Sequence, residues 1–201
     1  MRERAAETRE YGTRVGALTG WRYCPRCATE VTQDEGCVEC PACGFVHYAH
    51  SSPAVSALVV DGAGRMLLGR RAHDPDAGLW DMLGGFLEEG EHPLDGLRRE
   101  LLEETGLEVE TGDFLGAYID TYGEGPQVVS VLNLVWETRI VSGEPSPADD
   151  VSELRWFPRD EPPAPEECAF RWVTKFLRSQ ASADLGVRSQ GSTQDRGQAE
   201  A

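Results

Sequence analysis

The sequence predicts an α/β domain with a mixed sheet flanked by helices, preceded by a small four-cysteine zinc ribbon. Three observations support this fold class. Two short cysteine pairs lie near the N-terminus, β-branched apolar runs fill the middle of the chain, and the elements follow the order strands, helix, strands, helix. This order is typical of a mixed sheet and not of a parallel doubly wound sheet.

The cysteine pairs Cys24-Pro-Arg-Cys27 and Cys40-Pro-Ala-Cys43 each place two thiolates on one tight turn. Two such turns, twelve residues apart, predict a tetrahedral structural Zn²⁺ site. Cys37 also forms a Cys-x-x-Cys pair with Cys40, but the repeated Cys-Pro-x-Cys pattern favours Cys43. Disulfides are not expected, because cytosolic thiols stay reduced.

The distribution of apolar residues divides the chain into four parts. The segment before the ribbon has weak periodicity, and the last residues lack the apolar side chains that offset ordering entropy. A ribbon this short needs a metal to stabilise it. We therefore expect a flexible arm over 1–20, a zinc ribbon over 21–51, a main domain over 52–179 and a disordered tail over 180–201.

The elements of the main domain follow from periodicity and turn residues. Leu94, Leu97 and Leu101 have helix spacing, and Gly106 is a typical helix stop. The turn residues Asp61–Gly64 predict a hairpin between two strands. We expect strands at 54–60, 65–71 and 80–86, a helix over 92–105, strands near 108–120, 128–140 and 153–157, and a second helix over 166–179.

Composition limits the classes of function. Of 201 residues, 40% are hydrophobic and 27% are charged, and no apolar run is long enough to span a membrane. The charged N-terminus lacks the core of a secretory signal, so we expect a cytoplasmic protein without a membrane partner. The net charge of −16 makes nucleic acid an unexpected partner. Residues 1–26 contain six arginines and three glutamates, and this small positive excess is too little to form a nucleic-acid-binding patch.

An acidic helix carries the chemistry. Glu100, Glu103 and Glu104 are spaced i, i+3 and i+4, so they share one face of the helix. Such a run is often only a solvated acidic face. Here, however, it lies beside a leucine stripe and follows a glycine-bearing loop. Mg²⁺ is typically held by carboxylates plus substrate phosphates, so this face suggests metal-assisted attack on a phosphate chain.

The segment 85–107 resembles the Nudix box of the Nudix hydrolases, G-x5-E-x7-R-E-U-x-E-E-x-G-U, where U is a bulky aliphatic residue. Every defined position matches: Gly85, Glu91, Arg99, Glu100, Leu101, Glu103, Glu104, Gly106 and Leu107. The strand order extends the resemblance over residues 54 to about 178.

The resemblance implies an α/β/α sandwich with a mixed sheet. It implies hydrolysis of a nucleoside diphosphate linked to another moiety, with Mg²⁺ or Mn²⁺ held by Glu100, Glu103 and Glu104. The backbone carbonyl of Gly85 is a further candidate ligand. Arg99 would pair with a box carboxylate, Glu91, and fix the helix geometry.

The ribbon before the box resembles that of the NADH pyrophosphatase group. That group's marker, Ser-Gln-Pro-Trp-Pro-Phe-Pro-x-Ser, is missing, so NADH-like and ADP-ribose-like substrates both remain open, as does NAD-capped RNA. A non-catalytic nucleotide-sensing or RNA- or protein-binding module is the alternative, and homodimer formation stays undecided. The general base is a box glutamate or one of Glu144, Asp149, Asp150 and Glu153. Candidates for base stacking are Trp80, Phe86, Tyr118 and Tyr122.

Overall fold

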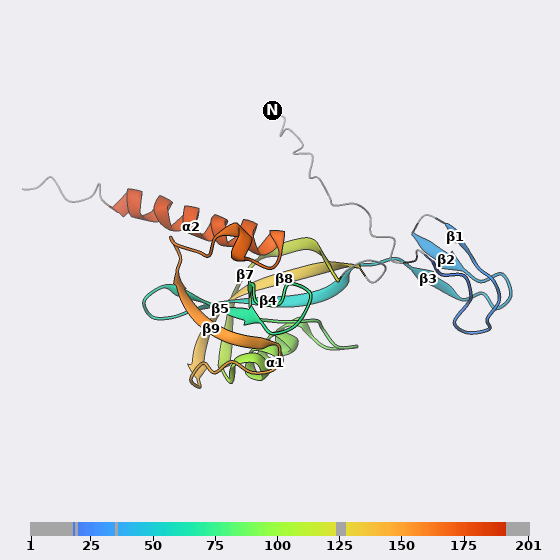
Figure 1. Ribbon diagram of the computed structural model, residues 1–201, viewed down its shortest axis with the longest axis horizontal. Helices are drawn as coiled ribbons and strands as arrows, with labels where there is room; N and C mark the ends of the chain where they lie inside the picture. The colour runs from blue at the N-terminus through green and yellow to red at the C-terminus, as the bar shows by residue number, and fades with distance from the viewer. Residues whose placement is uncertain (1–17, 19, 35, 124–127, 192–201) are drawn as a thin grey trace, which may run out of the picture. The chain divides into compact units, whose positions relative to one another are not determined.

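The computed structural model describes residues 18, 20–34, 36–123 and 128–191 (Figure 1). The chain divides into two compact units. One comprises residues 1–52 and 119–132, and the other comprises residues 53–118 and 133–201. Most of the predicted arm and the last ten residues of the predicted tail lie outside the described residues. None of the helices in the described part of the chain is long and apolar enough to cross a membrane.

The first unit contains a small antiparallel sheet of three strands, β1 (Thr32–Asp34), β2 (Cys37–Glu39) and β3 (Val46–Tyr48). Each strand has only three residues, so the sheet buries little apolar surface. Its core consists of Leu18, Cys24, Val31, Val38 and Cys40. Two of these five residues belong to the predicted zinc site, which agrees with a module that a metal stabilises.

The second sheet is mixed and has six strands, in the order β6-β5-β4-β8-β7, with β9 paired to β5. These strands are β4 (Ser52–Val60), β5 (Arg65–Arg71), β6 (Trp80–Asp81), β7 (Glu108–Tyr122), β8 (Val129–Ser142) and β9 (Val151–Pro158). The predicted hairpin joins β4 to β5, and the Asp61 carboxylate accepts the Ala63 and Arg65 amides at 2.9 and 2.8 Å.

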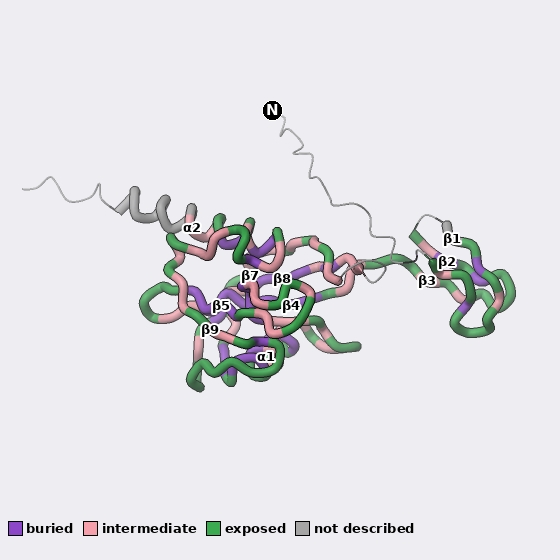
Figure 2. The backbone as a smooth tube through the Cα atoms, in the orientation of Figure 1, coloured by how far each residue is buried: buried purple, intermediate pink, exposed green. Residues whose placement is uncertain are grey.

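The two helices cover opposite faces of this sheet (Figure 1). Alternate residues of β4 enter two separate cores: Val55 and Val59 pack with the leucines of α1 (Pro93–Thr105), while Leu58 packs with Phe176 of α2 (Arg171–Gly191). Figure 2 shows the buried backbone along the central strands and the inner sides of the helices. The α/β/α sandwich with a mixed sheet is therefore confirmed.

Helix α1 begins and ends where the sequence predicts. The His92 side chain accepts the Leu94 amide at 3.3 Å, and Pro93 occupies the first turn, where a missing N–H does no harm. Gly106 ends the helix with φ of 69°, a left-handed conformation that glycine adopts without strain. These caps fix the position of the acidic face along the sheet.

Two predicted elements differ from the structure. The strand expected over 80–86 stops at Asp81, and beyond it only isolated bridges join Leu83 and Phe86 to β4. Gly84 has φ of 134° and lies so close to the Val55 carbonyl that no side chain would fit. The chain therefore turns away from regular strand geometry before the acidic helix.

The second helix starts later and ends later than predicted. Pro165–Glu167 form a short 3₁₀ turn, and Cys168 then bridges Trp80 in an extended conformation, with the Ala169 amide donating to the Trp80 carbonyl at 2.9 Å. This pairing interrupts the helix expected from residue 166. Helix α2 continues to Gly191, so the tail expected to be disordered is helical over 180–191.

Candidate active site

Arg99 joins three carboxylates of the box. Its Nε and Nη2 donate to the two Glu91 carboxylate oxygens at 2.8 and 2.9 Å, in a bidentate pair. Its Nη1 donates to Glu100 at 2.8 Å and to Glu103 at 3.1 Å. The Arg99 hydrogen bonds to Glu91, together with one from the Glu88 amide, lower the pKa of Glu91 to about 2. Arg99 thus offsets part of the like-charge repulsion and orients the acidic face.

Glu104 points the other way, into the protein. Its side chain is buried, and its Oε2 accepts the Gly84 amide at 2.8 Å. Burial raises the pKa of Glu104 well above its usual range, and the nearby charges of Glu100, Asp81 and Asp150 act in the same direction. A buried carboxylate among other acids is strained in its charged form, which a divalent cation would relieve.

Two glycines bring the loop close to the helix. A side chain at Gly85 would collide with the Glu100 carboxylate, because its Cβ would lie 2.6 Å from Oε1. The Gly85 carbonyl accepts the Val55 amide at 2.9 Å, so one of its two lone pairs is used within the fold. The loop backbone therefore lies directly against the box carboxylates.

The acidic loop after β8 is attached to the end of α1. The Ser146 amide donates to the Thr105 carbonyl at 3.0 Å, and the Ala148 amide donates to the Glu104 carbonyl at 2.9 Å. Asp149 follows with φ of 50°, an uncommon conformation for a residue other than glycine. Its charge contributes to a raised pKa of Glu100, for which burial is the main cause. The loop thus brings acidic groups near the box.

Sequence reasoning missed two residues beside this site, Arg71 and Asp81. Arg71 Nη1 pairs with Asp81 Oδ2 at 3.2 Å, its Nε donates to the Pro75 carbonyl at 2.7 Å, and its guanidinium lies over the Phe170 ring. Both side chains line a small polar pocket together with Glu104 and Asp150. The available signal was one charged residue at the end of each of two strands, Arg71 in β5 and Asp81 in β6, but nothing in the sequence showed that they meet.

Asp81 gives the fold a measurable pH dependence. Burial raises the pKa of Asp81 to about 6, against the opposing effect of Arg71. Between its ordinary pKa and pH 6, the folded state binds a proton that the unfolded chain has released, so the free energy of unfolding falls as pH rises. We expect the melting temperature of Asp81→Asn, relative to the parent, to increase between about pH 4 and 7. Asp95→Asn, on the exposed face of α1, serves as the control, and an unchanged difference across this range would contradict the assignment.

The four candidate stacking residues have different environments. Trp80 is buried, with the Arg155 guanidinium over its ring and the Phe157 ring edge-on to it, and Tyr118 packs against Trp172 of α2. Tyr122 belongs to the other unit. Phe86 has a side chain 40% exposed, and its carbonyl accepts Arg99 Nη2 at 3.2 Å. Of the four, Phe86 is therefore the residue that the structure brings both to the surface and to the box.

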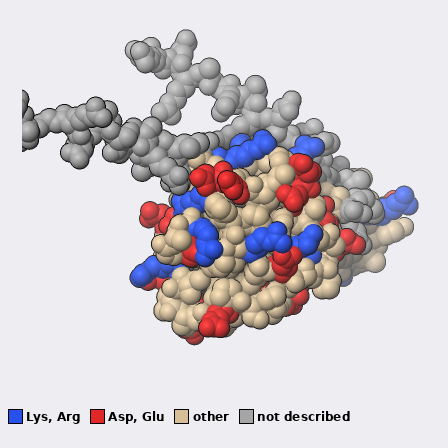
Figure 3. All heavy atoms as spheres, turned by 60° about the vertical axis from the view of Figure 1, so that its left-hand side comes forward, with Lys and Arg blue, Asp and Glu red and all other residues tan. Residues whose placement is uncertain are grey.

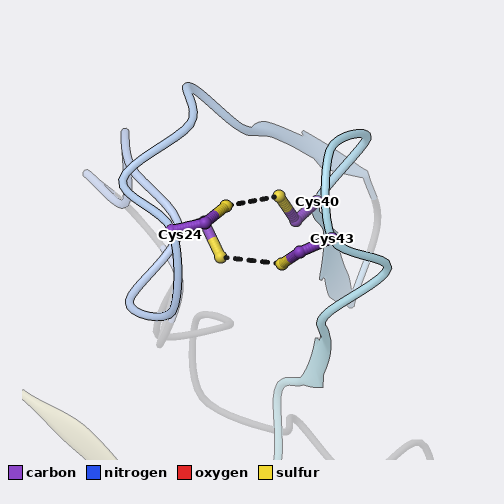
Figure 4. Close-up of side chains that lie close together, drawn as sticks. Cys24, Cys40 and Cys43 are labelled. Carbon is purple, nitrogen blue, oxygen red and sulfur yellow. Dashed lines mark hydrogen bonds between the residues drawn. The ribbon is translucent and has the colours of Figure 1, made fainter.

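The four cysteines Cys24, Cys27, Cys40 and Cys43 form one cluster, in which all sulfur atoms lie within 4.8 Å of one another. The Sγ atoms of Cys24 and Cys43 are 3.6 Å apart, and those of Cys27 and Cys40 are 3.5 Å apart. Figure 4 shows the labelled side chains converging from two turns. A tetrahedral zinc with bonds of about 2.3 Å requires sulfur separations of about 3.8 Å, so this donor set fits Zn²⁺.

The electrostatics of the cluster also favour a cation. Hydrogen bonding by Thr29 lowers the pKa of Cys27 to about 6. The Phe45 amide acts to lower the pKa of Cys43, but hydrogen bonding with Cys27 and burial raise it to about 12. Neighbouring thiols therefore resist ionising together unless a metal neutralises them. Cys37 lies outside this cluster, half-buried on β2.

Surface charge is mixed over the face that Figure 3 presents, where acidic and basic side chains alternate. Ion pairs of the chain include Arg70 with Glu153 at 3.2 Å and Arg155 with Glu153 at 2.6 Å. These pairs lie on β5 and β9. The net negative charge of the chain therefore does not take the form of a continuous acidic field on this face.

Comparisons with known proteins agree with the geometry. A protein of Pseudomonas aeruginosa called NAD-capped RNA hydrolase NudC is 32% identical over 150 residues, which cover 73% of this chain and 51% of that protein. A MutT-like protein of Streptomyces ambofaciens is 32% identical over 138 residues, which cover 69% of this chain and 82% of that protein. The chain spans about half the length of the NudC relatives that it matches.

The fold has solved counterparts as well. The crystal structure of a NUDIX hydrolase from Nitrosomonas europaea superimposes with a TM-score of 0.67 and 26% identity, covering 83% of this chain and 93% of that one. The family model of the NUDIX domain matches residues 50–177, well over half of the chain. Because this match includes the complete box and both helix-covered faces of the sheet, the chain belongs to the Nudix family.

Proposed function

We propose that the protein is a divalent-metal-dependent pyrophosphohydrolase, which cleaves the phosphoanhydride bond of a nucleoside diphosphate linked to another moiety. One observation carries the proposal: Arg99 holds the Glu100 and Glu103 carboxylates, and the Gly84–Gly85 backbone lies against Glu100 and donates to Glu104. A module that only senses a nucleotide has no need for three acids at this point. This arrangement of acids therefore favours an enzyme over the binding module.

Glu100, Glu103 and Glu104 would hold Mg²⁺ or Mn²⁺, with the Gly85 carbonyl as a further candidate. A bound divalent cation neutralises pyrophosphate oxygens and lowers the pKa of water. The protein's own contribution is positioning. Arg99 fixes Glu91 and Glu100 at 2.8 Å, and the Gly84 amide fixes Glu104 at 2.8 Å. Rigid donors of this kind stabilise charge that develops in the transition state without reorganising.

Two members of the acidic loop are the better candidates for the general base outside the box. Asp149 and Asp150 act electrostatically on Glu100 and Glu104. Glu153 instead pairs with Arg70 and Arg155, which hold its pKa below the usual range. Glu144 lies in the same exposed loop, before the residues that are attached to α1. A base must retain access to a proton of the attacking water, which favours Asp149 or Asp150.

We therefore expect one of Asp149→Asn and Asp150→Asn to reduce kcat by about 10²–10⁴, the usual contribution of general acid–base catalysis. Glu144→Gln and Glu153→Gln, the matched controls, should retain near-parental kcat. The pH profile of kcat should lose its acidic limb in the affected variant. If all four variants keep parental kcat and pH profile, the base belongs to the box.

The ribbon and the NudC relatives favour a substrate with two nucleoside halves, such as NADH or NAD-capped RNA. The chain lacks the Ser-Gln-Pro-Trp-Pro-Phe-Pro-x-Ser marker of the NADH pyrophosphatase group, so ADP-ribose-like compounds are equal candidates. Monophosphate release should be measured across NADH, ADP-ribose, diadenosine polyphosphates, nucleotide sugars and nucleoside triphosphates, with Mg²⁺ and with Mn²⁺. We expect one of the first three classes to be preferred. Preference for nucleoside triphosphates would contradict the proposed linkage.

A further inference from the structure

The small polar pocket beside the box is bounded by segments that are far apart in the sequence. Its volume is about 40 Å³, and its lining comes from β5, from β6 and the residues after it, from α1 and from the start of β9. The charged residues of this lining are Arg71, Asp81, Glu104 and Asp150. A space of this size holds a few water molecules at most and no part of a nucleotide. The pocket therefore concerns the setting of the box carboxylates and not the binding of a substrate.

The pocket brings Asp81 close to the Glu104 carboxylate. Glu104 is buried, and its Oε2 accepts the Gly84 amide at 2.8 Å. Burial is the main cause of the raised pKa of Glu104, and the charge of Asp81 contributes to it. The two carboxylates therefore interact electrostatically, although they come from a strand end and from the helix.

Both carboxylate oxygens of Asp81 are used within the fold. Oδ1 accepts the Met82 amide at 2.8 Å, and Oδ2 accepts Arg71 Nη1 at 3.2 Å. The Asp81 side chain is only 16% exposed. These bonds give its negative charge a fixed position beside Glu104. Asp81 is therefore suited to act on a bound cation through Glu104 and not as a direct ligand.

Arg71 holds the other side of this arrangement. Its Nε donates to the Pro75 carbonyl at 2.7 Å, so the guanidinium is fixed independently of Asp81. The next residue, Ala72, donates its amide to the Asp150 carbonyl at 2.7 Å and so attaches the acidic loop to the end of β5. Among the described residues that line the pocket, Arg71 is the one cationic side chain, and it faces three acids. The lining therefore stays negative in spite of the arginine.

We infer that Asp81 is a positioning residue for the divalent cation of the box: its fixed negative charge strengthens the hold of Glu104 on the cation, and the charge of Arg71 limits this effect. Since Glu104 would hold the cation of the proposed hydrolase, this role rests on that proposed function. Groups that adjoin metal ligands typically change metal affinity by about 10–100-fold. If the pair were merely structural, loss of either member would lower stability and metal affinity together.

The test measures Mn²⁺ affinity directly, from the EPR signal of free Mn²⁺, with the full chain and without substrate. At about pH 8 Asp81 is charged, because its pKa is about 6. We expect Asp81→Asn to weaken Mn²⁺ binding about tenfold. The same variant should melt at or above the parental temperature, because burial, which raises the pKa of Asp81, disfavours its charged form. Structural damage would not give this combination of weaker metal binding and retained stability.

Arg71→Gln is the opposite test, and two further variants are controls. Removal of the arginine charge should shift the Mn²⁺ affinity to tighter binding, whereas Arg71→Lys, which keeps the charge, should stay near the parent. Asp95→Asn makes the same change in net charge on the exposed side of α1 and should leave the affinity unchanged. Should Arg71→Gln lose its fold, the comparison of Asp81→Asn with Asp95→Asn still decides.

Shifts of the Mn²⁺ affinity in the same direction for Asp81→Asn and Arg71→Gln would overturn the inference, as would equal effects of Asp81→Asn and Asp95→Asn. A loss in Asp81→Asn as large as that in Glu104→Gln would make Asp81 a direct ligand and contradict the positioning role. Hydrolysis is measured separately. A parent protein that binds Mn²⁺ but cleaves no substrate overturns the proposed function alone, and one that binds no Mn²⁺ overturns both.

Discussion

Replacing Glu103 or Glu104 by glutamine is expected to abolish most turnover while leaving the fold intact. If both carboxylates hold the catalytic metal, each variant loses charge stabilisation in the transition state. A comparable electrostatic contact contributes about 10²–10³ in rate. The loss should appear in kcat at saturating Mg²⁺.

The same substitutions should not destabilise the protein. Glu104 is buried among other acids, and a glutamine keeps an oxygen that accepts the Gly84 amide, so Glu104→Gln should melt at or above the parental temperature. Asp95→Asn is the control, because Asp95 lies on the exposed side of the same helix, where its carboxylate pairs with Arg98 at 3.1 Å. Near-parental kcat in both glutamine variants would rule out the assigned metal site and favour a nucleotide sensor.

Loss of one zinc ligand is the second large effect that we expect. Structural zinc contributes on the order of 10 kcal/mol to the folding of small zinc modules. Cys40 is a buried member of the cluster, so Cys40→Ser should reduce zinc content from about one atom per chain to nearly none and unfold the three-stranded unit. Atomic absorption measures the metal, and limited proteolysis between residues 20 and 52 measures the folding of this unit.

Cys37→Ser provides the matched control. Cys37 also belongs to a Cys-x-x-Cys pair with Cys40, yet it lies outside the sulfur cluster. It should therefore keep its zinc and its resistance to protease. If Cys37→Ser loses zinc and Cys43→Ser keeps it, the ligand set is wrong.

Local patterns predicted most of the fold because they act over a few residues. The hairpin at Asp61, the leucine spacing of α1 and the Gly106 stop are all short-range signals, and each element has nearly its expected bounds. The second helix was displaced because Cys168 pairs with Trp80, a contact between segments distant in the sequence. A contact between distant segments cannot be predicted from the helix or strand propensity of the local sequence.

The candidate site likewise combines features that short-range sequence patterns predict with features that depend on contacts between distant segments. The spacing placed Glu100, Glu103 and Glu104 on one face of the helix, and the Arg99–Glu103 hydrogen bond is of the i, i+4 kind that helix spacing predicts. The inward direction of Glu104 and the meeting of Arg71 with Asp81 depend on how α1 packs on the sheet. The sequence left a box glutamate and four other acids open as the general base. Only the folded structure separates Asp149 and Asp150 from Glu153, which two arginines hold.

Hydrolysis in ¹⁸O-labelled water tests the central claim most directly. The full chain is incubated with NADH or ADP-ribose, with and without Mg²⁺ or Mn²⁺, and the released monophosphates are analysed by mass spectrometry. We predict metal-dependent cleavage of at least one of these substrates, with a single ¹⁸O atom in one of the two monophosphates, because water attacks one phosphorus. Binding of both compounds without cleavage, at any concentration of either metal, would contradict the account and identify the protein as a nucleotide-binding module.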